Sequence, residues 1–181
     1  MNTSAADSSL DIAVWFIARA QKDEWFLENE KLQNLLFLSQ LHYALQNDGQ
    51  LLMPSLFTAN RYGFQEPNIA KILQTGKNCL TTSRLPAEVT SFLEKIWKIY
   101  GIMSLKQLAN MIKQQTSYPE QYPSETKIIV EINSLVEKLK TQSKIERTTK
   151  FKETEKKVLI SQNGPVVVSK WQPRKLGNGG N

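Results

Sequence analysis

The segment Lys31–Leu45, KLQNLLFLSQLHYAL, decides the fold of this chain. Its leucines recur every three or four residues and also fill intervening positions, so apolar side chains surround most of a helix. Such a helix is typical of the centre of a domain, where other elements cover it on several sides. Three polar residues remain, Gln33, Gln40 and His42. Each must find a partner or lie at a rim, because an unpaired buried polar group costs ~1–3 kcal/mol.

Length and composition predict one soluble domain of ordinary size with a tail. The chain has 181 residues, of which 40% are hydrophobic, and four tryptophans can contribute to a core. No apolar run approaches the roughly 20 residues that a membrane span requires. The segment Met1–Ser9 lacks a basic residue, so it does not resemble a secretory signal. The single cysteine, Cys79, excludes an internal disulfide framework and favours a reducing cytoplasm.

The net charge of +6 is unevenly distributed. From Lys138 to the C-terminus there are eleven basic and three acidic residues, a net charge of +8, whereas the preceding part carries −2. A basic tail on a nearly neutral body favours an anionic partner. The alternative is an extension that only increases solubility.

Helical patterns cover most of the chain before the tail. We expect a first helix that is capped by Asp7 or Ser8 and ends near Lys22. Trp25 and Phe26 follow it, and we expect both side chains to fold back over the core.

The later helices have clear start signals. The apolar spacing predicts a helix over Pro86–Gly101, and Ser104–Gln107 has the pattern of a capping box for the next helix. A long last helix is expected from Ser124, with Ile128 and Ile129 facing inward.

Extended structure is predicted in two places. One is a strand near residues 56–60, and the other is a C-terminal hairpin near residues 157–171, where Asn163-Gly164 separates two β-branched runs. A lone two-stranded hairpin is marginal in water, so this one should pair with the Leu56 segment, pair with another chain, or remain mobile. The predicted fold class is mainly α. A compact multi-helix domain over 8–143 carries a small β element, and residues 144–181 form a basic extension.

No catalytic constellation is evident in the sequence. A thiol–imidazole pair of Cys79 and His42 is conceivable, but a single histidine on a leucine-rich helix is usually a packed or rim residue. No cluster has metal-ligand spacing, and no glycine-rich loop has the flanking strand and helix of a phosphate site. We therefore expect no enzyme activity, no metal and no cofactor.

Ordered motifs in the first two thirds of the chain carry a resemblance to a known family. The central motif is Lys-Leu-Gln-x-Leu-Leu-Phe-x-x-Gln, and later come Arg-Tyr-Gly, a proline four residues beyond that glycine, and a Tyr-Gly before the Ser104 segment. Together they resemble the Panacea domain family, which includes SocA-like and phage-associated GepA-type antitoxins. The resemblance covers roughly residues 11–122. The residues that carry it most directly are Lys31, Leu32, Gln33, Leu36, Gln40, Tyr43, Arg61, Tyr62, Gly63 and Pro67.

Two positions depart from the family pattern. Asn60 stands where the family usually has tryptophan, and Phe64 stands where it usually has proline. If those family residues line a functional surface, that surface differs here. The resemblance implies a cytoplasmic antitoxin-type module that neutralises a toxin by binding it or, in at least one branch, delivers it for proteolysis.

The leading hypothesis is a protein-binding module whose partner is a toxin. The basic tail lies outside the resemblance and is the candidate for partner choice, through strand addition and an aromatic anchor. One alternative is a nucleic-acid-binding or autoregulatory protein that uses the basic tail, and another is a structural subunit of a phage or secretion assembly. The tail residues proposed to bind the partner are Val158, Ile160, Val166, Val168, Trp171, Arg174 and Lys175.

Overall fold

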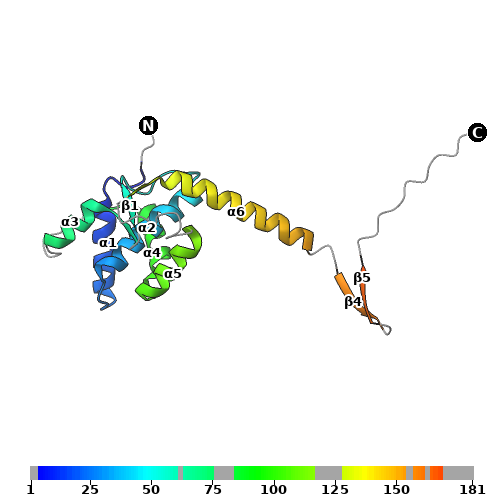
Figure 1. Cartoon of the computed structure of the whole chain (residues 1–181). Coiled ribbons are helices and arrows are strands. Elements are labelled where there is room, and N and C mark those ends of the chain that lie inside the picture. Colours follow the sequence, from blue (N-terminus) through cyan, green and yellow to red (C-terminus); the bar gives the residue numbers. More distant parts are fainter. Residues whose placement is uncertain are drawn as a thin grey trace, which may run out of the picture. The chain divides into compact units, whose positions relative to one another are not determined.

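A computed structural model describes residues 4–60, 63–75, 84–116, 128–153, 157–161 and 164–168 (Figure 1). The chain divides into two compact units, residues 1–139 and 140–181. The boundary falls within one helix, Ile132–Glu153. Within the described ranges, no helix combines the length and the apolar character needed to cross a membrane.

The first unit is built mainly of helices and contains one small sheet. The fold class predicted from the sequence, mainly α with a small β element, is confirmed. In chain order the elements are α1 (Ser9–Lys22), α2 (Asn29–Gln46), β1 (Phe57–Asn60), β2 (Gly63–Gln65), α3 (Pro67–Thr75), α4 (Ala87–Ile96), the π-helix η2 (Trp97–Gly101), α5 (Leu105–Thr116), β3 (Ile128–Val130) and α6 (Ile132–Glu153), which continues into the second unit.

Helix α2 lies at the centre of the first unit, as its sequence predicts. It contacts α1, α3, α4, α5 and β2, so neighbours cover it on several sides. Its leucines and its phenylalanine form the middle of the core. Among these, the side chains with no exposed surface are Leu32, Leu35, Leu36, Phe37, Leu38 and Leu41.

The helix boundaries follow local signals in the sequence. Of the two candidate caps for α1, Ser8 is the one used, because its hydroxyl accepts a 3.0 Å hydrogen bond from the Leu10 amide. The capping box before α5 is also confirmed. The Ser104 amide donates to Oε1 of Gln107 at 2.8 Å, and the Gln107 amide donates to Oγ of Ser104 at 3.3 Å.

The three strands of the first unit form an antiparallel sheet in the order β2-β1-β3. The prediction that Ile128 and Ile129 face inward from a helix was wrong, because they belong to β3 and are 39% and 60% exposed. Consecutive β-branched residues suit a strand, and this one pairs with β1. The last helix begins only at Ile132.

The second unit contains the C-terminal hairpin, β4 (Lys157–Ser161) and β5 (Gly164–Val168), which form a two-stranded antiparallel sheet. One partner suggested by the sequence was the Leu56 segment. Within the first unit, β2 and β3 occupy both edges of β1, and pairing of the hairpin with that segment stays a prediction.

Candidate protein-binding surface

The two glutamines of the central motif act as clamps on backbone. The side chain of Gln40 has no exposed surface, and its amide both donates to the Met53 carbonyl and accepts from the Met53 amide, each at 3.1 Å. Gln33 holds Glu66 in the same way, with a bond of 2.8 Å from the Glu66 amide and a longer one of 3.5 Å to its carbonyl. Both polar groups thus find the partners that their burial requires.

Glu66 in turn begins the next helix. Its carboxylate has no exposed surface and accepts a 2.6 Å hydrogen bond from the Ile69 amide in the first turn of α3. It also accepts a 3.1 Å bond from the side-chain amide of Asn68. A carboxylate at a helix N-terminus satisfies free amides and complements the helix dipole. Gln33 therefore fixes the position at which α3 starts.

The third polar residue of α2, His42, is bonded to Tyr100. Nε2 of His42 lies 2.7 Å from the Tyr100 hydroxyl, and the two rings stack with centroids 5.4 Å apart. Burial lowers the pKa of His42 and raises the pKa of Tyr100, so both are neutral near pH 7. The tautomer of His42 decides the direction of this bond: the hydroxyl donates to an unprotonated Nε2, or the Nε2–H donates to the hydroxyl oxygen. This contact joins α2 to η2.

The pKa of His42 predicts how stability depends on pH. The unfolded chain titrates His42 near the ordinary pKa of 6.5, whereas the folded pKa lies below it. Between these values the unfolded state binds more protons, so the free energy of unfolding should decrease as pH falls below about 6.5. Above that pH this contribution should be constant. Denaturant unfolding at a series of pH values should show that the free energy of unfolding falls less with decreasing pH in His42→Gln than in the wild type. If the free energies of the two proteins run parallel over this pH range, His42 is not the group responsible.

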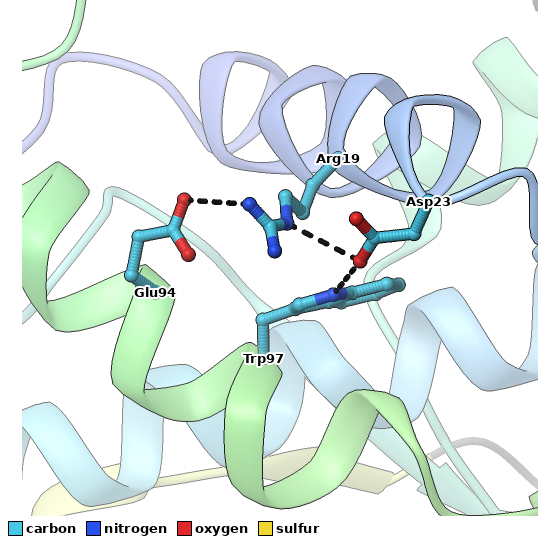
Figure 2. Close-up of polar contacts among 4 residues, drawn as sticks. All are labelled: Arg19, Asp23, Glu94 and Trp97. Atoms are coloured by element: carbon cyan, nitrogen blue, oxygen red, sulfur yellow. Dashed lines mark hydrogen bonds and ion pairs between the residues drawn. The ribbon is translucent and has the colours of Figure 1, made fainter.

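A cluster of four side chains joins α1 to α4 and η2 (Figure 2). The guanidinium of Arg19 lies between two carboxylates, with Nη1 3.2 Å from Glu94 and Nε 3.4 Å from Asp23. The same Asp23 oxygen accepts a 2.8 Å hydrogen bond from the indole N–H of Trp97. All four groups are engaged with one another, so the cluster fixes the orientation of the indole ring.

Lys31 makes a second connection beside this cluster. Its ammonium donates a 2.6 Å hydrogen bond to the Gly101 carbonyl at the end of η2 and lies 5.9 Å from the centre of the Trp25 ring. Burial lowers the pKa of Lys31, against the attraction of Glu28. A cation at the C-terminal end of a helix is favourable. The first residue of the family motif therefore ties the α1–α2 connection to η2.

Gly101 is required by its close approach to Trp97. A Cβ atom at this position would lie 2.6 Å from Cδ2 of the indole and 2.9 Å from two further ring atoms. Trp97 cannot easily move away, since it is only 3% exposed and its ring packs on Phe16 and Trp25. The Tyr-Gly motif thus has a steric cause in this chain.

Three apolar residues are exposed in or next to the segments that make these contacts. Trp25 is 43% exposed although its ring packs 5.8 Å from that of Trp97, and the adjacent Phe26 is 86% exposed. The prediction that Phe26 folds over the core was wrong. Ile102 is 70% exposed and directly follows the Gly101 carbonyl that Lys31 holds. We call Trp25, Phe26 and Ile102 the apolar patch.

The other motif residues that the structure describes pack against the core or begin a strand or helix. Tyr43 packs edge-on against Phe92 with centroids 5.1 Å apart, and Leu32 and Leu36 are core residues. Gly63 begins β2 and Pro67 begins α3. Arg61 and Tyr62 lie outside the described residues, as does Cys79.

Phe64, one of the two positions that depart from the pattern of the resembled family, lies in the core. It is 4% exposed, and its ring stacks on that of Phe37 with centroids 4.0 Å apart and planes 9° apart. Phe64 therefore packs β2 against α2. Asn60, the other departure, pairs with Gly63 in the β1–β2 ladder.

The proposed partner-binding residues of the tail are divided between described and undescribed parts. Val158 and Ile160 lie on β4, and Val166 and Val168 lie on β5. All four belong to one two-stranded ladder, but none of them pairs directly with another of the four. The others, Trp171, Arg174 and Lys175, lie outside the described residues.

An open pocket of about 810 Å³ lies apart from the residues that the sequence analysis singled out. No group of three or more His, Cys, Asp or Glu side chains within the described part of the chain could hold a metal ion. The lining of the pocket comes from α1 and from the start of α4, and consists of Asp11, Trp15, Arg84, Leu85, Pro86, Ala87, Thr90 and Ser91.

Sequence reasoning did not identify the polar cluster or the apolar patch. Arg19, Asp23 and Glu94 are ordinary surface residue types, and only the fold brings Glu94 next to α1. One signal was present, because two adjacent aromatic residues stand in a short connection between helices.

Comparison with protein-family models, with curated proteins and with solved structures finds no match to this chain.

Proposed function

We propose that this chain is an antitoxin-type, cytoplasmic protein-binding module that neutralises or delivers a partner protein, a toxin, by direct contact. The observation that carries the proposal is the apolar patch, in which Phe26 is 86% exposed and Ile102 70% exposed. Exposed large apolar side chains beside a well-packed support are typical of a binding surface. The resemblance to the Panacea family supports the choice of a toxin as partner.

The support beneath the patch favours recognition of another protein. The Trp25 ring rests on Trp97, whose indole is fixed by Asp23, and Lys31 holds the neighbouring backbone. A rigid aromatic side chain loses little conformational entropy when it binds, and aromatic residues dominate binding energy at protein interfaces. Phe26 and Trp25 are therefore the expected anchors.

Serine substitutions in the patch test the proposal. Phe26→Ser and Ile102→Ser should each weaken partner binding by about tenfold or more, because truncating an anchor residue typically costs at least ~2 kcal/mol. The assay expresses the gene neighbour whose product stops growth, together with wild type or variant, and measures growth rescue. Affinity for the purified neighbour product is then measured by titration calorimetry.

The matched control is Ile129→Ser. Ile129 is 60% exposed on β3 and lies outside the patch, so this variant should rescue growth like the wild type. All three variants should keep the wild-type melting temperature, since their side chains are mainly in solvent. If the patch variants bind and rescue as well as the control, the patch is not the binding surface.

A further inference from the structure

The register of the β4–β5 hairpin decides which backbone groups are left unpaired. Ser161 pairs with Gly164, and only two residues separate them, so they close the hairpin as a hydrogen-bonded pair. Bonded and non-bonded pairs alternate along an antiparallel ladder. The amides and carbonyls of Val158 and Ile160 on β4 therefore point away from β5.

The two outer edges of the hairpin are not equivalent. On β5 the outward positions are Pro165 and Val167, which pair with Ile160 and Val158. Proline has no N–H, so the β5 edge lacks one of its two donors. The β4 edge keeps both donors and both acceptors. In the described part of the second unit the sheet ends at these two strands, so the β4 edge is the complete one.

We infer that the outer edge of β4 docks an extended segment of a partner protein in which acidic and apolar residues alternate. The inference rests on the proposed function, because the partner is taken to be a protein. Charge complementarity selects acidic residues, since the part of the chain from Lys138 onward carries a net charge of +8. The same charge on two copies opposes pairing of this chain with itself. A nucleic acid would neutralise the charge but leave the donors and acceptors of the β4 edge unpaired.

A matched pair of proline substitutions tests this in the full-length chain. Val158→Pro and Val167→Pro alter the two members of one cross-strand pair, and neither removes a hydrogen bond within the hairpin. The probe is a fluorescein-labelled peptide of alternating glutamate and valine, and binding is measured by fluorescence anisotropy. Val158→Pro should weaken binding about tenfold, whereas Val167→Pro should stay within about twofold of the wild type.

Amide hydrogen exchange of the wild-type chain gives an independent measurement. Adding the acidic peptide should slow exchange at Val158 and Ile160 and leave Val167 unchanged. The peptide assay tests the β4 edge, whereas growth rescue by the patch variants tests the apolar patch, so a failure of one is distinguishable from a failure of the other.

Three results would overturn the inference. The first is equal weakening of peptide binding by both proline variants. The second is a ligand without acidic residues, either a peptide of alternating lysine and valine or a DNA duplex, that binds as tightly as the acidic peptide and whose affinity Val158→Pro does not change. The third is a dimer of the free chain, seen by analytical ultracentrifugation, that Val158→Pro dissociates, since a second copy would then occupy the edge.

Discussion

Gln40→Leu is expected to lower the free energy of unfolding by about 2–5 kcal/mol. Leucine resembles glutamine in size, so the loss comes from hydrogen bonding. Without the clamp, the amide and the carbonyl of Met53 would both lack their partner, and Met53 has no exposed surface. Each unsatisfied buried group costs about 1–3 kcal/mol. Urea unfolding followed by circular dichroism measures the change.

Two other glutamines of α2 provide the comparison. Gln46→Leu removes an exposed side chain at the end of the helix, so it should change stability by less than about 0.5 kcal/mol. The loss of stability in Gln33→Leu should lie between those of the other two variants, because one of the two hydrogen bonds from Gln33 to Glu66 is long. If Gln40→Leu destabilises no more than Gln46→Leu, the Met53 clamp does not contribute to stability.

Gly101→Ala is expected to lower the free energy of unfolding by about 1–3 kcal/mol, the usual cost of overpacking a core. The direction is opposite to helix propensity, since alanine is normally favoured over glycine within a helix by roughly 0.5–1 kcal/mol. The cause is the 2.6 Å approach of the added Cβ to the Trp97 ring. Thermal unfolding followed by circular dichroism gives the change.

A double-mutant cycle with Trp97→Phe isolates the steric cause. A smaller ring leaves room for the methyl group, so Gly101→Ala should cost less in the Trp97→Phe background, and its sign should approach that of helix propensity. The same cycle should show whether the fluorescence of Trp25 changes, since its ring packs on Trp97. Equal costs in both backgrounds would show that Trp97 is not the obstacle.

The central part of the fold is predictable because its signals are local and redundant. In α2 the apolar pattern alone predicts burial on all sides, and burial alone predicts that Gln33 and Gln40 have partners. The capping box at Ser104 also follows from residue types at a fixed spacing. The partners themselves could not be predicted, since Met53 and Glu66 contribute backbone groups that every residue except proline possesses.

The failures have a common physical origin in long-range pairing. Ile128 and Ile129 continue the apolar spacing of α6, and only the availability of an edge on β1 turns them into a strand. Likewise Phe26 is apolar, and its sequence alone does not show that the space over the core is already taken by Trp25 and Trp97. The apolar patch becomes visible only when exposure is known.

The glutamine clamps also have an evolutionary consequence. Each contact is one-sided, because a particular side chain on α2 holds main-chain atoms that do not depend on the residue type at positions 53 and 66. Natural variation at those two positions can therefore proceed without compensating exchanges on the helix. Methods that infer proximity from correlated substitutions would miss these contacts, because burial at position 53 and the carboxylate that starts α3 at position 66 constrain those residues independently of the glutamines.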